Sequence, residues 1–186
     1  MKKQYALEQL AASFQGVIQY EEQDLLQENA NVDGEGLRTV IFFAGCPHRC
    51  YGCHNPKSWK IENGTSMTKK QILEEIISNP LTEVTFSGGE PLYQAFEVKE
   101  LAKEIKAYGK NLWVYTGYTL EEIYNSKNDD MIETLKHVDV LVDGRFEMKK
   151  RDVTLPFRGS SNQRIIRLKE GRESDDNGQN SAACRG

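Results

Sequence analysis

The sequence predicts an α/β fold with a mainly parallel sheet, and three observations lead to this prediction. From Arg38 onward, short apolar runs rich in β-branched and aromatic residues alternate with segments of helical periodicity. Such alternation is typical of parallel strands joined by right-handed helical crossovers. Four of the apolar runs lead directly into loops that contain glycine. The chain has 186 residues, of which 38% are apolar, and this fits one domain with one core.

The strands are predicted from short apolar runs bounded by turn residues. The amino-terminal stretch comes first, with a short amphipathic helix over 5–14 and a strand over Val17–Tyr20. The later strands, in chain order, are 39–43, 84–86, 112–115, 138–142 and 163–168.

The helices are predicted from their caps and apolar stripes. One helix begins at Thr68, which has Gln71 three residues on and so fits a capping box. A second covers 95–108, where apolar residues recur on one face. A third begins at Thr119, which has the same relation to Glu122.

The chain divides into three parts by composition. Residues 1–30 form an amino-terminal extension to which the sequence assigns no role, and 31–169 form the main domain. Residues 170–186, which include Cys184, are rich in Gly, Ser, Asn and Asp. We expect this tail to be disordered, because it has almost no apolar surface whose burial would offset the entropy of ordering it.

Charge and hydropathy exclude several classes of protein. The net charge of −4 disfavours a protein whose whole surface binds nucleic acid. No stretch approaches the roughly 20 apolar residues of a membrane span. The basic start of the chain is not followed by the apolar region of about 7–15 residues that a secretion signal requires. We therefore expect a cytoplasmic protein without a nucleic-acid or membrane partner.

Three of the four cysteines lie close together and indicate a metal site rather than disulfides. Cys46, Cys50 and Cys53 have the spacing Cys-x3-Cys-x2-Cys. Three thiolates in one tight loop can hold three corners of a [4Fe–4S] cubane, which leaves the fourth iron without a protein ligand. That open corner can bind a substrate, and the three cysteines are therefore the predicted cluster ligands.

Other interpretations of the cysteine loop remain open from these residues alone. A structural zinc site needs four ligands, so His48 or His54 would have to complete it. An electron carrier of the ferredoxin kind needs a fourth cysteine, and only Cys184 is available. Three incidental buried cysteines are the third alternative. The simpler role for the two histidines is to orient the loop.

The glycine-containing loops are predicted to meet the cysteine loop at one site. They lie at Gly45, Gly88–Gly89, Gly117 and Gly144, each directly after a predicted strand. The carboxyl ends of parallel strands face the ligand in α/β folds. Glycine allows the main chain to approach a ligand closely, and Glu90 after the Gly-Gly turn adds an acceptor for an ammonium group.

The cysteine spacing followed by Ser-Gly-Gly-Glu-Pro at 87–91 resembles the radical S-adenosylmethionine (SAM) superfamily. The resemblance implies a partial (β/α) barrel in which SAM chelates the open iron of the cluster. It also implies that one electron from the cluster breaks the sulfonium C–S bond and releases a 5′-deoxyadenosyl radical. No side chain is predicted to act as a general base, because the radical removes a hydrogen atom.

Five further stretches narrow the resemblance to the activating proteins of anaerobic ribonucleoside-triphosphate reductases. They are residues 32–38, 53–56, 113–118, 141–146 and 157–166. The resemblance implies that the protein generates a glycyl radical on the large subunit of the reductase, with an electron donor such as flavodoxin. The SAM contacts that it implies are Gly52, Cys53, His54, Gly88, Gly89, Glu90, Thr116, Gly117 and Asp143.

Two alternatives to this function stay open. One is an activating enzyme for another glycyl radical enzyme, such as pyruvate formate-lyase. The other is a non-catalytic module that binds an iron–sulfur cluster or zinc.

Overall fold

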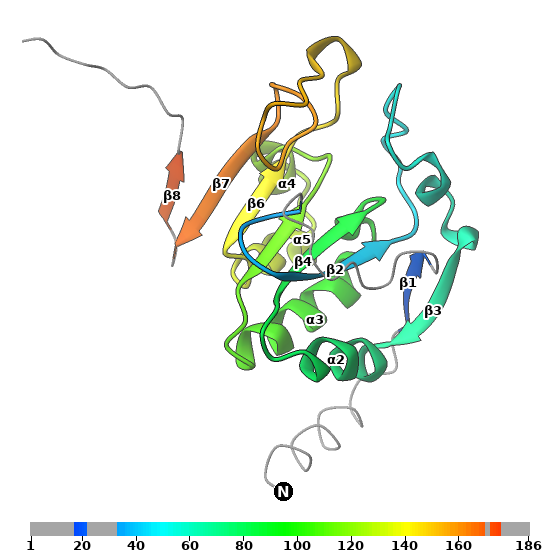
Figure 1. Cartoon of the computed structure of the whole chain (residues 1–186), viewed down its shortest axis with the longest axis vertical. Helices are drawn as coiled ribbons and strands as arrows, with labels where there is room; N and C mark the ends of the chain where they lie inside the picture. The colour runs from blue at the N-terminus through cyan, green and yellow to red at the C-terminus, as the bar shows by residue number, and fades with distance from the viewer. Residues whose placement is uncertain (1–16, 22–32, 170–171, 176–186) are drawn as a thin grey trace, which may run out of the picture.

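A computed structural model describes residues 17–21, 33–169 and 172–175 of the chain. In these residues one sheet has the strand order β3-β1-β2-β4-β5-β6-β7-β8 (Figure 1). The strands are β1 Val17–Glu21, β2 Arg38–Phe43, β3 Gly64–Thr68, β4 Glu83–Gly88, β5 Leu112–Tyr115, β6 Val140–Asp143, β7 Arg164–Lys169 and β8 Arg172–Asp175. The α-helices are α2 Lys69–Ser78, α3 Ala95–Ala107, α4 Leu120–Asn125 and α5 Asp129–Leu135. Short 3-10 helices are η2 Pro56–Trp59, η3 Ile61–Asn63, η4 Pro91–Gln94 and η5 Met148–Lys150.

The four central strands of the sheet, β2, β4, β5 and β6, are parallel. Antiparallel strands extend the sheet on both sides, β1 and β3 at one edge and β7 and β8 at the other. The predicted α/β class is confirmed, and the parallel arrangement holds for the centre of the sheet. Within the described ranges the edge strands β3 and β8 do not pair with each other, so the sheet is open rather than closed into a barrel.

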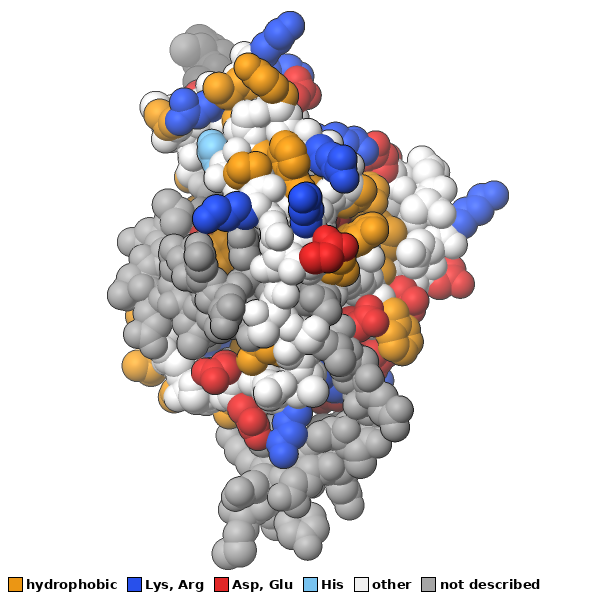
Figure 2. Space-filling view, turned by 90° about the vertical axis from the view of Figure 1, so that its right-hand side faces the viewer, with side chains coloured by type: hydrophobic (Ala, Val, Ile, Leu, Met, Phe, Trp, Pro, Cys, Tyr) orange, Lys and Arg blue, Asp and Glu red, His pale blue; other side chains and the backbone are white. Residues whose placement is uncertain are grey.

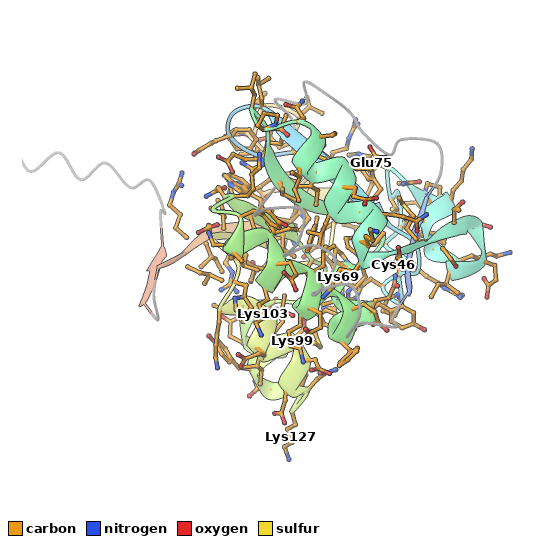
Figure 3. All side chains as sticks on the ribbon, turned by 90° about the horizontal axis from the view of Figure 1, so that it is seen from below. Cys46, Lys69, Glu75, Lys99, Lys103 and Lys127 are labelled. Carbon is orange, nitrogen blue, oxygen red and sulfur yellow. The ribbon has the colours of Figure 1, made fainter. Side chains whose placement is uncertain are left out.

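The α-helices pack on one face of the sheet. Ile41, Phe86, Val114 and Leu141 are cross-strand neighbours in the central strands and belong to the main core. Apolar residues of α2, α3, α4 and α5 complete this core. Viewed from below, α2 and α3 lie in front of the sheet and carry the labelled Glu75, Lys99 and Lys103 (Figure 3). No helix among the described residues is long and apolar enough to span a membrane.

The other face of the sheet, which we call the open face, carries a smaller cluster. Trp113, Val140 and Val142 are its buried members, and Tyr115 and Phe157 are among the residues that pack against them. Side chains alternate between the two faces along a strand, which is why Trp113 and Tyr115 point away from Val114. Loops rather than α-helices contribute the non-strand residues of this cluster, which leaves room for a binding site.

The predicted helix starts are confirmed in detail. The Thr68 side chain accepts a hydrogen bond from the Gln71 N–H while the Gln71 side chain bonds the Thr68 backbone, and Thr119 and Glu122 do the same at α4. The strand predicted at Val17–Tyr20 is β1, and the last predicted strand is β7. The helix predicted over 5–14 lies outside the described residues.

Two strands and one α-helix have no counterpart among the predicted elements. Strand β3 is largely polar and so carries little local signal, and helix α5 is only 7 residues long, although Asn128 caps its start. Strand β8 lies in the tail for which disorder is predicted, and it pairs with β7 through the register Lys169↔Arg172. Main-chain hydrogen bonds to a neighbouring strand can hold such a polar segment where apolar burial does not. Residues 170–171 and 176–186 of this tail are not described.

Candidate metal centre

A cavity of about 740 Å³ lies at the carboxyl ends of the parallel strands. Figure 1 shows the loop after β2 and the loop after β6 extending from the same edge of the sheet. The lining residues include the three cysteines of the loop and the glycines that follow β4, β5 and β6, namely Cys46, Cys50, Cys53, Gly88, Gly89, Gly117 and Gly144. The cysteine loop and these glycines therefore share one site.

The cysteine loop is held to the body of the protein by its main chain. Gly45 has φ of 93°, a conformation that glycine adopts readily, and it turns the chain out of β2. The Gly45 N–H donates to the Ser58 carbonyl at 2.8 Å, and the Cys46 N–H donates to the Trp59 carbonyl at 3.1 Å. Main-chain hydrogen bonds thus hold both ends of the loop.

The three thiols suit an iron–sulfur cluster. Each is unpaired and half-buried, and burial raises the pKa of the Cys46 and Cys50 thiols. Metal ligation requires the thiolate, so a bound metal would compensate the buried charge. Among the described residues no three His, Cys, Asp or Glu side chains are grouped as ligands of one metal ion. A cubane does not need such a group, because each thiolate binds a different iron.

Gly88 and Gly89 bring the turn after β4 against the cysteine loop. A Cβ at Gly88 would lie 2.5 Å from the Phe43 nitrogen, and a Cβ at Gly89 would lie 2.6 Å from the Gly45 oxygen. The Gly89 N–H also donates to the Phe43 carbonyl at 2.7 Å. The two glycines line the cavity, but the close approach that demands them is to the protein's own main chain.

Glu90 is fully buried, and its carboxylate forms hydrogen bonds with four donors. We call Glu90 and these donors the Glu90 network. Oε2 lies 2.8 Å from His48 Nε2 and accepts from the Gly117 N–H at 2.8 Å. Oε1 accepts from the Thr116 hydroxyl at 2.9 Å and from the Leu92 N–H at 3.0 Å. Glu90 does not line the cavity. The network uses both oxygens of Glu90, and the predicted contact of this carboxylate with an ammonium group stays a prediction.

The two histidines of the loop differ. The His48 side chain is 5% exposed, and through Glu90 it ties the cysteine loop to the end of β5. A Cβ at Gly117 would lie only 2.3 Å from His48 Cδ2, so the ring packs flat against this glycine. His54 lies beside the Phe146 ring, with 5.1 Å between the ring centroids. The simpler role predicted for His48, that of orienting the loop, agrees with these contacts.

Two other predicted SAM contacts do not line the cavity. The Asp143 side chain is 1% exposed and accepts hydrogen bonds from the Arg164 guanidinium and from the Leu120 N–H at 2.8 Å. Its carboxylate is thus used inside the protein. A Cβ at Gly52 would meet the Met148 sulfur at 3.0 Å, so this glycine packs beside η5. The predicted contacts that do line the cavity are Cys53, His54, Gly88, Gly89, Thr116 and Gly117.

Sequence reasoning missed part of the cavity wall. Asp33, Tyr115, Phe157 and Arg158 line the cavity in addition to the predicted residues. A signal for them exists, because all four lie in stretches that carry the family resemblance. A linear motif does not say which of its side chains faces a cavity, so the sequence does not single them out.

The comparisons with known proteins agree with this site. Residues 32–166 match the family described as a 4Fe-4S single cluster domain, and the fold and the three-cysteine loop accordingly place the chain in this class of iron–sulfur proteins. An activating protein of anaerobic ribonucleoside-triphosphate reductase from Pasteurella multocida (strain Pm70) is 40% identical over 147 residues, which cover 74% of this chain and 91% of the relative.

Two more relatives carry the same name. The protein of Escherichia coli (strain K12) is 36% identical over 149 residues, covering 74% of this chain and 93% of its own length. The protein of Enterobacteria phage T4 is 37% identical over 141 residues, covering 72% and 86%. The chain belongs to the family of anaerobic ribonucleoside-triphosphate reductase-activating proteins.

Proposed function

We propose that this protein reductively cleaves SAM at a [4Fe–4S] cluster and generates a glycyl radical on an anaerobic ribonucleoside-triphosphate reductase. The observation that carries the proposal is the position of Cys46, Cys50 and Cys53, which line one cavity at the carboxyl ends of the parallel strands. Three ligands leave one iron of a cubane for a substrate, whereas a structural or purely electron-transferring site would use four.

The cluster and SAM would supply the redox chemistry. Held by Cys46, Cys50 and Cys53, a reduced cluster would supply one electron for cleavage of the sulfonium C–S bond of SAM, which would give methionine and a 5′-deoxyadenosyl radical that could take a hydrogen atom from glycine Cα. The residues of the chain would hold and position these groups. The cysteine loop holds the cluster, and the Glu90 network fixes that loop against the ends of β4 and β5.

Some SAM contacts implied by the resemblance remain part of the proposal. Gly88, Gly89, Thr116 and Gly117 would lie along SAM at the strand ends, with Cys53 and His54 beside them in the cavity. For Glu90 and Asp143 we propose positioning roles instead, because internal hydrogen bonds occupy both carboxylates. The domain would have the partial-barrel arrangement of the radical SAM type.

The partner follows from the family. The relatives are named for activating an anaerobic reductase, and we propose the same target for this chain, with an electron donor of the flavodoxin type in the cytoplasm. Activation of pyruvate formate-lyase or another glycyl radical enzyme is the alternative substrate choice. Incubation with each purified partner separates them, since only the correct partner acquires a glycyl radical signal in electron paramagnetic resonance.

The test of the chemistry is anaerobic and uses two cysteine variants. The protein is reconstituted with iron and sulfide, mixed with SAM and dithionite, and assayed for 5′-deoxyadenosine. We expect product from the wild type and from Cys184→Ala, and none from Cys50→Ala, because only the second variant removes a cluster ligand. Wild-type protein that carries a verified cluster but forms no product, with or without the reductase, would favour the non-catalytic module.

A further inference from the structure

The segment after β6 lies directly against the cysteine loop. The Phe146 N–H donates a hydrogen bond to the Cys50 sulfur. A Cβ at Gly52 would meet the Met148 sulfur at 3.0 Å, so η5 packs beside the same turn of the loop. The segment 145–151, which contains η5, therefore follows the cysteine loop from Cys50 onward.

Main-chain groups hold this segment in place. The Lys150 N–H donates to the Glu147 carbonyl at 2.8 Å, and the Ser161 N–H donates to the Lys150 carbonyl at 2.9 Å. The Glu147 N–H donates to the Ser160 hydroxyl at 3.2 Å. Because these bonds need no basic side chain, the Lys and Arg side chains of the segment can change without loss of its main-chain support.

Most of this segment lies outside the cavity. Cys50 and Arg145 line the cavity, whereas residues 148–151 do not, and neither does Tyr51. Cys50 thus has the cavity on one side and an exposed surface on another. We call this surface the η5 patch, and its members are Tyr51, Met148, Lys149, Lys150 and Arg151.

The η5 patch has apolar side chains and basic ones. Tyr51 is 86% exposed and Met148 is 46% exposed, and the three cations are also exposed. Lys150 pairs with Glu147 at 2.9 Å in an exposed ion pair, which contributes little stability. Figure 2 shows hydrophobic and basic side chains gathered together in the upper part of the molecule. Aromatic residues, Met and Arg are enriched at protein interfaces, so the composition fits a protein partner.

Positive charge is concentrated around the cysteine loop in a chain whose net charge is −4. Residues 145–151 contain four Lys or Arg and one Glu, and residues 46–61 contain three Lys or Arg and no Asp or Glu. The rest of the chain is therefore strongly acidic. A basic surface on an acidic protein attracts a negatively charged partner and orients it during encounter.

The proposed chemistry consumes one electron for each SAM that is cleaved. The protein that supplies this electron has to approach the cluster while SAM occupies the cavity. It does not have to enter the cavity, because an electron needs only a short distance to the cluster and no bond to it. The η5 patch offers such an approach, since it lies beside the ligand Cys50 and outside the cavity.

We propose that the η5 patch is the docking surface for the electron donor, a protein with a negatively charged surface around its redox group. This proposal rests on the proposed function and names where the reductant binds. The donor is oxidised by one electron and the cluster is reduced by one, and no covalent bond forms or breaks at the patch. We expect a small and weak interface, as is usual for electron-transfer partners.

The test compares two charge-reversal variants of the cluster-loaded protein. Lys149→Glu with Lys150→Glu changes the η5 patch. Lys103→Glu with Lys127→Glu makes the same change in net charge at exposed positions on the helix side, where Figure 3 labels both residues.

Two quantities are measured at low salt, without SAM or reductase. They are the rate at which a reduced flavodoxin of negative net charge reduces the cluster, and the affinity of the oxidised flavodoxin for the protein. We expect the patch variant to lower both by about tenfold or more, because it removes electrostatic attraction at the contact itself. The helix-side control should change either by less than about twofold. Equal values for the two variants would overturn the proposal.

Two further readouts separate docking from an effect on the cluster. Photoreduced deazariboflavin, a small neutral reductant, should reduce the wild type and both variants at the same rate. The midpoint potential of the cluster should also be the same, and high salt should remove most of the difference seen with flavodoxin. A potential lowered enough to explain the slower reduction would mean that the lysines act on the cluster, which would overturn the proposal.

The reductase and the SAM chemistry give distinct patterns. With deazariboflavin as reductant, the patch variant should need the same reductase concentration as the wild type for half-maximal glycyl radical formation. A raised reductase requirement with unchanged reduction by flavodoxin would assign the patch to the reductase and overturn the proposal. Protein whose reduction by flavodoxin depends on the patch but which forms no 5′-deoxyadenosine would overturn the proposed function and keep the docking surface.

Discussion

In the Glu90 network the polar groups of the chain are bonded to one another, whereas elsewhere on the cavity wall several buried donors of the described residues have no partner, namely the Trp59 Nε1–H, the Tyr115 hydroxyl and the Arg158 Nε–H. Glu90 receives four donors, and His48, Thr116 and Gly117 are tied through it. Tyr115 and Arg158 instead keep buried donors unsatisfied. A completed network fixes one geometry, as a cluster requires, while an unpaired buried donor costs free energy until a hydrogen bond satisfies it.

The comparison predicts that changes in the Glu90 network lower the stability of the protein itself. Gly117→Ala would place a methyl group 2.3 Å from the His48 ring, which must swing away and break its bond to Glu90. We expect a loss of about 2–4 kcal/mol in stability and a large fall in cluster content. Chemical unfolding together with iron and sulfide analysis measures both.

A double variant shows whether the His48 ring is the cause. His48→Ala removes the clashing atoms, so His48→Ala combined with Gly117→Ala should cost much less than the sum of the single changes. Additive losses would instead mean that Gly117 is required for its main-chain conformation.

Glu90→Gln also changes the Glu90 network, and we expect it to lower stability less than Gly117→Ala does. One carboxylate oxygen becomes an NH2 group, which cannot accept from the Gly117 N–H or the Thr116 hydroxyl. We expect a loss of about 1–3 kcal/mol and weaker retention of the cluster. Cluster content and the KM for SAM are to be measured together. Normal cluster content with a strongly raised KM would show that Glu90 contacts SAM directly and does more than position the cysteine loop.

Asp33→Asn changes a residue of the cavity wall outside the Glu90 network and should act in the opposite direction on stability. Because burial raises the pKa of Asp33, the folded state disfavours its charged form. The charge therefore destabilises the protein at neutral pH, and this cost disappears as the pH falls through the raised pKa towards the ordinary value of 3.8. The neutral amide should raise the melting temperature by about 1–3 °C at pH 7.

Thermal melting at pH 7 and pH 4 checks the stability effect, which should shrink at the lower pH. A melting temperature that falls at pH 7 would mean that the Asp33 charge holds the fold together.

Much of the fold follows from local patterns in the chain. The capping boxes at Thr68 and Thr119 are predictable because a cap involves residues only three positions apart. The central strands follow from short apolar runs between turns. Strand β8 and the antiparallel edge at β3 do not, because polar edge strands are selected by the neighbouring strand rather than by their own periodicity.

By itself, the sequence predicted three ligands for the proposed cluster and the edge of the sheet where the structure places these cysteines. Cys46, Cys50 and Cys53 are close in the chain, and parallel strands bring their carboxyl ends together, so both inferences rest on local spacing. Only the tertiary structure decided which polar groups face the cavity. Glu90 turns inward to His48, and Tyr115 stays unpaired, because partners 42 residues apart meet through packing that no local pattern encodes.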